Sequence, residues 1–194
     1  VEFHGVSVHP GSSKDTMVNA SLVAMEFDSM LPKGETPRDT EGYEGFYHLL
    51  NMEGECALAK LHYIIRDHDV EKFNQRKEIM KQITDDLNKK WGKGTVVLTL
   101  KDQYRNMREV IAQHMHLIDN AKKACETVRL TPQCLPIRGG TDGCQLSFRG
   151  LPCPNLGTGG HAYHGPYEHI TVEGMDKAVD MITELVKIYS IQYK

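Results

Sequence analysis

Residues 46–66 read FYHLLNMEGECALAKLHYIIR, and this stretch decides the fold of the first half of the chain. Two runs rich in aliphatic and aromatic residues, 46–52 and 57–66, are separated by Glu-Gly-Glu, which is the spacing of a β-hairpin. In the second run, one face holds Leu58, Lys60, His62 and Ile64, and the other holds Ala59, Leu61, Tyr63 and Ile65. The stretch predicts two antiparallel strands.

The chain before this hairpin has the pattern of one strand and one helix. Residues 1–8 alternate apolar and polar side chains, as a half-buried strand does. An apolar stripe with three- and four-residue spacing then runs over 17–27 and predicts a helix, which Ser13 or Asp15 can cap. A polar loop over 33–45 leads into the hairpin.

The chain after the hairpin repeats this order in reverse. Residues 69–91 form a charged amphipathic pattern that predicts a helix, and 95–104 form a strong strand pattern. The order strand, helix, strand, strand, helix, strand is that of a ferredoxin-like α+β domain, a four-stranded antiparallel sheet with two helices on one face. We assign this domain to 1–106, and its edge strands and open face are surfaces suited to dimerisation.

The second half follows a different pattern. Residues 107–127 and 172–189 predict helices, 141–148 a helix turn, and 135–137 and 154–156 short strands. Strands that alternate with helices indicate an α/β layer, and two short strands suggest the end of a larger domain, over 107–194. The predicted stripe of the last helix consists of Met175, Val179, Ile182, Leu185, Val186 and Tyr189.

Composition excludes several classes of function. A net charge of -3 argues against nucleic acid or an anionic membrane as the main partner. No apolar run is long enough to span a membrane. The five cysteines are an odd number without a C-x-x-C pair, which favours reduced thiols in a cytoplasmic protein.

A glycine-rich stretch, 136–168, holds the clearest candidates for chemistry. The turn from Arg138 through Gly140 and Thr141 to Asp142 leads into a helix and can aim a guanidinium and backbone N–H groups at a carboxylate. The same residues could instead form a surface ion pair between Arg138 and Asp142. His164 could be a metal ligand or an ordinary surface histidine, with Glu168 as its partner or as a helix cap.

Two further candidates end predicted strands. His9 follows the first strand, before a proline, and Arg66 ends the second strand of the hairpin. Strand ends of one sheet can converge, so a histidine and an arginine there could bind the carbonyl and the carboxylate of one substrate. Both side chains could also simply face solvent.

Taken together, these motifs closely resemble a known family. The series FHGVSVHPG, ETPRDTEGYEGFYHL, HYIIRDHD, PIRGGTDG and YHGPYEHITVEGM is similar, in order and spacing, to tripeptide aminopeptidases of the dizinc metallopeptidase family that carries a dimerisation lid. The resemblance covers nearly all of the chain. It implies a lid domain over 1–106, followed by the C-terminal portion of an α/β catalytic domain.

The resemblance also implies roles for individual residues. The HG motif supplies a zinc ligand, His164, and the lid histidine, His9, reaches the partner subunit's active site and polarises the scissile carbonyl. The lid arginine, Arg66, binds the carboxylate end of the peptide. The turn from Arg138 to Gly143, which includes Gly140, Thr141 and Asp142, frames the substrate and metal pocket. These roles imply a tripeptide substrate and a homodimer formed through the lid.

One departure from the family limits what the chain can do alone. The family holds two zinc ions with five ligands and uses a glutamate as general base, and apart from His164 these residues precede the lid. We therefore expect this chain to be inactive by itself. In the complete enzyme, zinc-activated water would attack the first peptide bond of a tripeptide, His164→Ala would abolish zinc binding and activity, and His9→Ala would mainly lower kcat.

Two alternatives remain open. The first is a non-catalytic interaction module in which the ferredoxin-like half dimerises and the glycine-rich half is scaffold. The second is a carboxypeptidase or deacylase of the same wider family, which would hold the other end of its substrate. Tripeptides with free and blocked N-termini distinguish the second alternative from an aminopeptidase.

Overall fold

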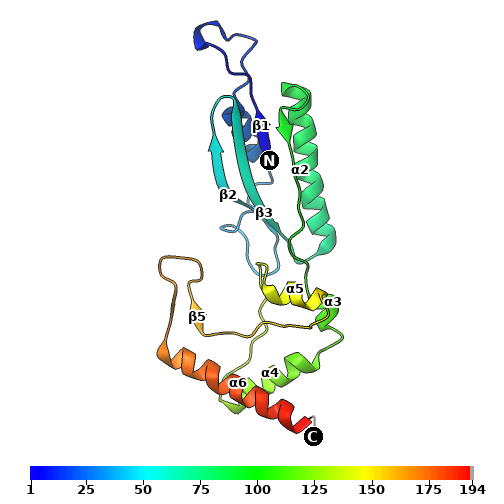
Figure 1. Ribbon diagram of the computed structural model, residues 1–194, viewed down its shortest axis with the longest axis vertical. Helices are drawn as coiled ribbons and strands as arrows, with labels where there is room; N and C mark the ends of the chain where they lie inside the picture. Colours follow the sequence, from blue (N-terminus) through cyan, green and yellow to red (C-terminus); the bar gives the residue numbers. More distant parts are fainter. Residues whose placement is uncertain (193–194) are drawn as a thin grey trace. The chain divides into compact units, whose positions relative to one another are not determined.

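The computed structural model describes residues 1–192, which divide into two compact units (Figure 1). The first unit holds 1–102 together with 136–139, and the second holds 103–135 together with 140–192. Because 136–139 return to the first unit, that unit is not one continuous stretch of sequence. The expected boundary at residue 106 stays a prediction.

A four-stranded antiparallel sheet forms the centre of the first unit, and this part of the predicted fold is confirmed. The strands β1 (Glu2–His4), β2 (Phe46–Gly54), β3 (Leu58–Arg66) and β4 (Val96–Val97) lie in the order β2-β3-β1-β4. Every neighbouring pair is antiparallel. The β2–β3 hairpin is the longest pairing, and its register shifts between Leu49 and Asn51, where β2 carries one extra residue.

The strand predicted over 95–104 is much shorter than expected. Its neighbour β1 has only three residues, so the ladder is limited to Phe3 opposite Val96 and Glu2 opposite Val97. Beyond Val97 the described part of the chain offers this strand no further partner. A run of β-branched residues predicts an extended backbone, but a strand also needs a neighbour of equal length.

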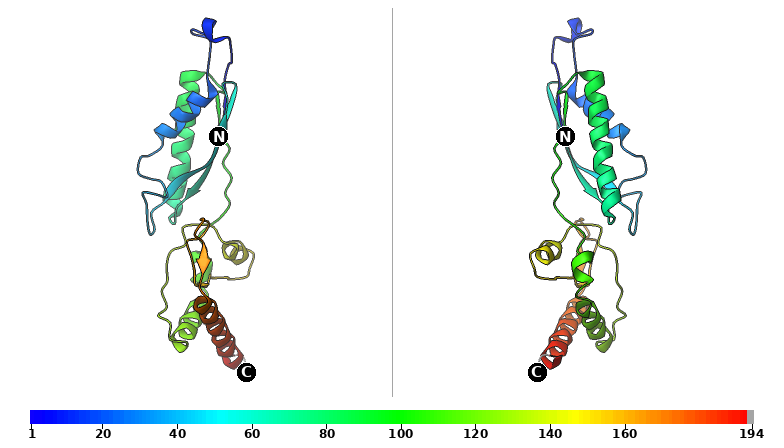
Figure 2. Two further views of the ribbon diagram at one scale, coloured as in Figure 1. Left: turned by 90° about the vertical axis from the view of Figure 1, so that its left-hand side faces the viewer. Right: turned by 90° about the vertical axis from the view of Figure 1, so that its right-hand side faces the viewer.

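Two helices cover one face of this sheet (Figure 2). They are α1 (Ala20–Met30) and α2 (Val70–Trp91), and a short 3-10 turn, η1 (Pro10–Ser12), precedes α1. Asp69 caps α2 by accepting hydrogen bonds from two backbone N–H groups, as an acidic residue at that position should. The helix predicted over 17–27 is present as α1, but its predicted cap is wrong, because Asn19 and not Ser13 or Asp15 caps it.

The core of the first unit lies between the sheet and the two helices. Its largest fully buried side chains are Phe3, Val23, Phe27, Met80 and Leu87. Phe3 of β1 and Phe27 of α1 pack edge to face, with ring centroids 5.6 Å apart. Contacts between residues far apart in sequence therefore hold this unit together.

The second unit is mainly helical. Its elements are α3 (Arg108–Ile111), α4 (His116–Thr127), α5 (Asp142–Phe148), β5 (Gly160–His161), β6 (His169–Ile170) and α6 (Val172–Gln192). The predicted helices are present, but the strands predicted over 135–137 and 154–156 are not. Short apolar runs with proline need a neighbouring strand to form a ladder, and the described residues supply none there. The sequence reading also missed the β5–β6 hairpin.

The predicted buried stripe of α6 is largely wrong. The helix packs against α4, and among its residues 172–191 the one buried side chain is Met181, with Ala178, Leu185 and Ile188 half-buried at helical spacing. Most of the predicted stripe lies one residue further along and is exposed. The pattern misled because α6 has two adjacent apolar faces, and periodicity alone does not tell which is covered.

No helix among residues 1–192 is long and apolar enough to cross a membrane.

Candidate functional site

His9 lies exposed in the turn after β1, where it caps η1. Its Nδ1 accepts a hydrogen bond from the backbone N–H of Gly11 at 3.1 Å. Because Nδ1 is the acceptor, the neutral imidazole carries its proton on Nε2. The outward nitrogen is thus a hydrogen-bond donor, the form that could polarise a carbonyl oxygen.

Arg66 is the last residue of β3 and is half-buried. One terminal nitrogen donates to the carbonyl of Ile65 at 3.0 Å. The residue that follows, Asp67, has a side chain only 1% exposed. Arg66 therefore lies where the sheet meets a buried carboxylate.

The expectation that His9 and Arg66 converge within one sheet is wrong. β1 and β3 are antiparallel, and His4, near the end of β1, lies opposite Leu58, at the start of β3. The nine residues of β3 span about 26 Å at about 3.3 Å per step. His9 therefore follows one end of the sheet while Arg66 marks the other.

Arg138 lies in the first unit, where its side chain forms hydrogen bonds with the 40–44 loop. Its terminal nitrogens donate to the carbonyl and hydroxyl of Thr40, both at 2.6 Å, and to the carbonyl of Glu44 at 3.1 Å. The guanidinium lies 4.9 Å from the centre of the Phe46 ring. The structure thus pairs Arg138 with the 40–44 loop and gives no ion pair with Asp142.

The rest of the predicted turn lies in the second unit. A side chain at Gly140 would meet the ring of Tyr104 at 2.1 Å, so this backbone approaches the ring as only glycine allows. Thr141 precedes α5, and its hydroxyl accepts from Asn155 at 3.2 Å. Asp142 opens the helix and is exposed, where the helix dipole favours its charge.

His164 occupies the loop between β5 and β6 in a conformation unusual for histidine. Its φ of 64° is in the left-handed region, and its backbone N–H donates to the carboxylate of Glu168 at 3.1 Å. Glu168 therefore contacts the backbone of His164 and fixes the loop. Nearby, the rings of His161 and His169 stack across the hairpin, with centroids 5.2 Å apart.

The residues that the structure describes do not make a metal site by themselves. Within 1–192 there is no group of three or more His, Cys, Asp or Glu side chains arranged to hold a metal ion. One exposed imidazole is far from the four ligands that zinc usually takes. The described residues thus do not fit a complete zinc site, although His164 could supply one ligand to it.

The structure reveals a largely buried ionic cluster that the sequence reading missed, in which only the side chain of Glu35 is exposed, at 40%. Arg76 of α2 contacts the carboxylates of Asp67, at 2.9 Å, and Glu35. Burial opposes the charge of Arg76, but the hydrogen bonds and charges of both carboxylates outweigh it and raise its pKa. The ring of Tyr47 lies against the guanidinium. No local sequence motif predicts this cluster, because its residues come from a loop, a strand end and a helix.

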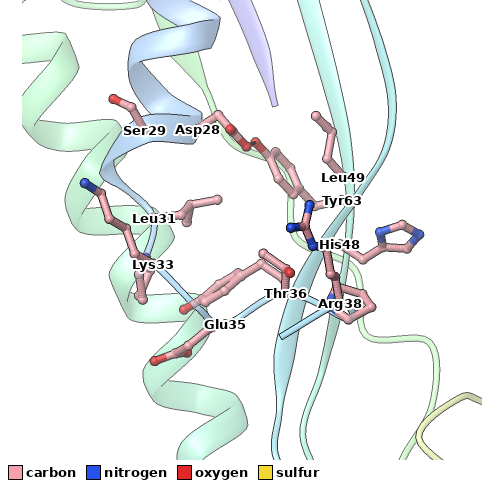
Figure 3. A pocket seen from close by; sticks show the side chains of 13 residues that line it. Asp28, Ser29, Leu31, Lys33, Glu35, Thr36, Arg38, His48, Leu49 and Tyr63 are labelled. Carbon is pink, nitrogen blue, oxygen red and sulfur yellow. Dashed lines mark hydrogen bonds between the residues drawn. The ribbon is translucent and has the colours of Figure 1, made fainter. Parts of the chain in front are cut away.

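A cavity of about 770 Å³ lies beside this cluster, between α1, the loop after it and the edge strand β2 (Figure 3). Its lining carries charges of both signs, including Asp28, Lys33, Glu35 and Arg38. The hydroxyl of Tyr63 donates to Asp28 at 2.7 Å. None of the site residues predicted from sequence lines this cavity.

Comparison with known proteins shows which family the chain is similar to. Residues 1–95 match the family described as peptidase dimerisation domain. The chain is 51% identical over 189 residues to a peptidase T of Caldanaerobacter subterraneus, covering 97% of this chain and 46% of that protein. It is 54% identical over 190 residues to a peptidase T of Clostridium perfringens, covering 98% and 47%. A solved tripeptidase from Staphylococcus aureus has a like fold, with a TM-score of 0.76 at 18% identity over 96% of this chain and 49% of that chain.

The sheet with its two helices therefore defines a peptidase dimerisation domain. Over nearly its whole length the chain is similar to proteins named peptidase T, at 51% and 54% identity. It spans about half the length of the curated relatives it matches.

Proposed function

We propose that the chain is the C-terminal half of a cytoplasmic tripeptide aminopeptidase, with a lid over 1–106 and the end of the catalytic domain over 107–194. The identity of about half to peptidases named peptidase T supports this assignment. The peptidases with this dimerisation domain are generally metal-dependent. Zinc is the metal we propose for the whole enzyme, as a pair of ions, and His164 is the one ligand this chain would supply.

The opposite placement of His9 and Arg66 is the observation that carries this proposal furthest. A substrate whose carboxylate is held at Arg66 lies beyond the reach of His9 from the same copy, because β3 separates them. A dimer removes this difficulty, since His9 can then come from the second copy. The match to a dimerisation domain supports that arrangement.

Each remaining residue has a role suited to its contacts. In our proposal, the Nε2–H of His9 donates to the carbonyl oxygen as negative charge develops on it, and Arg66 binds the C-terminal carboxylate. Arg138 fixes the 40–44 loop and keeps a buried Nε–H without an acceptor among the described residues. The Gly140–Asp142 turn frames the bound peptide.

The activity can be tested by joining this chain to the missing half of the Caldanaerobacter subterraneus peptidase T. We expect metal-dependent release of the first residue from free tripeptides and no cleavage when the N-terminus is acetylated. Cleavage of acetylated substrates instead would indicate a deacylase or carboxypeptidase. No cleavage of any peptide, with metal bound, would favour a dimerisation module without catalysis.

The shared site can be tested by mixing two inactive variants of that joined protein, His9→Ala and His164→Ala. Random pairing makes half of the dimers mixed, and each mixed dimer holds one complete site, so about a quarter of the wild-type activity should return. The single variants measured alone are the controls. If the mixture stays as inactive as its parents, or His9→Ala alone keeps the wild-type kcat, His9 does not act across the dimer.

A further inference from the structure

The loop between α1 and β2 carries an exposed aromatic ring in a tight turn. Tyr43 is 70% exposed, although an aromatic side chain usually loses much of its surface to packing. Residues 41–44 form the turn, in which the backbone N–H of Glu44 donates to the carbonyl of Glu41 at 3.0 Å. The carboxylate of Glu44 in return accepts from the backbone N–H of Glu41 at 2.8 Å. We call residues 41–44 the Tyr43 turn.

The Tyr43 turn is also held by contacts from outside it. Arg138 donates to the carbonyl and hydroxyl of Thr40, just before the turn, and to the carbonyl of Glu44. The ring of Tyr43 packs edge to face on the ring of His68, with centroids 5.0 Å apart. An aromatic side chain has few rotatable bonds, so a ring in a fixed turn loses little conformational entropy when it binds a ligand. The exposed ring is therefore a preorganised contact surface for an apolar group.

The Tyr43 turn lies beside the end of β3 that holds Arg66. His68, which supports the ring, follows Arg66 by two residues. Gly45 follows Tyr43 by two residues, and a Cβ at Gly45 would meet the Arg66 carbonyl at 2.6 Å. Phe46, the next residue, is the ladder partner of Arg66. Both stretches of the chain thus bring the exposed ring close to Arg66.

We propose that Tyr43 is a specificity-determining residue that contacts the third side chain of the tripeptide and favours a large apolar one, an inference that rests on the proposed function. A tripeptide carries its third side chain and its C-terminal carboxylate on the same carbon atom. When Arg66 holds that carboxylate, the side chain next to it comes within reach of the Tyr43 ring. A leucine or phenylalanine side chain buries apolar surface against the ring, whereas glycine and alanine have little to bury.

The test uses this chain joined to the missing half of the Caldanaerobacter subterraneus peptidase T, with four tripeptides that share their first two residues and end in Gly, Ala, Leu or Phe. Tyr43→Ala removes the ring. Tyr43→Phe keeps the ring and loses only the hydroxyl, so it is the matched control. Cleavage rates give kcat and KM for each peptide. Calorimetric titration, with the metal removed by a chelator, gives a Kd that does not depend on cleavage.

The unaltered protein and Tyr43→Phe should both favour the Phe peptide over the Ala peptide by at least about fivefold in kcat/KM. Tyr43→Ala should bring this ratio close to one by raising KM for the Phe and Leu peptides. Its kinetic constants for the Ala and Gly peptides should stay unchanged. This comparison separates lost recognition from a damaged fold, which would slow the cleavage of all four peptides alike.

Three outcomes overturn the proposal: an unchanged ratio in Tyr43→Ala, an equal loss for all four peptides, or no preference in the unaltered protein. If the unaltered protein cleaves none of the peptides, the proposed function fails, and the ratio of Kd values decides on Tyr43 by the same criteria. A Kd preference that needs the ring would then keep Tyr43 as a recognition residue of a peptide-binding module. Absence of binding would overturn both proposals.

Discussion

At the scale of single residues, the buried cluster of Arg76, Asp67 and Glu35 matters most for the first unit. The carboxylate of Asp67 is nearly inaccessible to water, and Arg76 is its charged partner. A buried charge that loses its partner is far costlier than an exposed one, because water cannot replace the lost contact. Gly45 belongs to the same arrangement, since a Cβ there would meet the Asp67 carboxylate at 2.1 Å.

We predict that Arg76→Met lowers the free energy of unfolding of the first unit by about 3–5 kcal/mol. The exposed pair of Lys81 and Glu78 provides the control, and Lys81→Met should cost less than about 1 kcal/mol. Urea unfolding followed by the fluorescence of Trp91, the one tryptophan, reports on this unit. Similar losses for the two variants would show that the buried cluster adds no stability.

A second prediction at this scale concerns pH. Burial raises the pKa of Tyr47 to about 12, from an ordinary value of 10.0. Because the folded state favours the neutral phenol, this stability is present below about pH 10 and is lost as the pH rises toward 12. Tyr47→Phe should therefore lose less stability than wild type between pH 9 and pH 12. Parallel curves for the two proteins would contradict the assignment. Tyr63, whose pKa is also raised, is unchanged in both.

At the scale of elements, the start of α1 shows how sequence reading goes wrong. Asn19 accepts hydrogen bonds from the backbone N–H groups of Ser21, at 3.0 Å, and Leu22, at 3.3 Å. Ser13 instead donates to the carbonyl of Pro10. Three residues that could cap the helix lie within seven positions. Which of them does so depends on where the extended backbone before the helix ends. Val6 pairs with Val18 there and so delays the helix.

The cap assignment leads to a third prediction. Asn19→Ala should destabilise the first unit by about 1 kcal/mol, since two backbone donors lose their acceptor. Ser13→Ala, at one of the two residues that the sequence predicted as the cap, should leave the urea midpoint unchanged within error. The reverse outcome would place the start of α1 earlier than Ala20.

How well each element could be predicted depends on where its partners lie in the sequence. The β2–β3 hairpin and α2 follow from local patterns, because the strands pair with each other and Asp69 caps its own helix. β4 and the packed face of α6 depend on elements distant in sequence, and there the local pattern predicted too much. The same distinction between local and distant partners applies to the candidate site. Its residues were named from motifs, but the distance between His9 and Arg66 follows only from strand direction.

At the scale of the whole molecule, the two units differ in how much apolar surface each of them buries within itself. The first unit encloses a complete core, whereas the second fully buries only four of its described apolar side chains, Ile111, Ala124, Cys144 and Met181. Proteins bury such surface because each apolar area removed from water stabilises the fold. The second unit should therefore unfold at lower urea concentration than the first.

A fourth prediction compares the complete chain with the isolated segment 1–106. The segment should fold, because the core residues all lie within it. It should nevertheless be less stable than the same unit in the complete chain by about 1–3 kcal/mol, since Arg138 no longer satisfies Thr40 and Glu44. Arg138→Ala in the complete chain should reproduce most of this difference, measured with Trp91. Equal stability of all three proteins would mean that Arg138 adds nothing to the first unit.

The return of residues 136–139 to the first unit has a consequence for how such a protein can evolve. A dimerisation domain inserted into an enzyme would be free to move between genes if it were one uninterrupted segment. Here Arg138, from residues 136–139, donates hydrogen bonds to Thr40 in a loop of the first unit. A gene fusion that transferred 1–106 alone would lose the hydrogen bonds between Arg138 and this loop. The domain is therefore inherited most safely together with the segment that follows it, as a single hereditary unit.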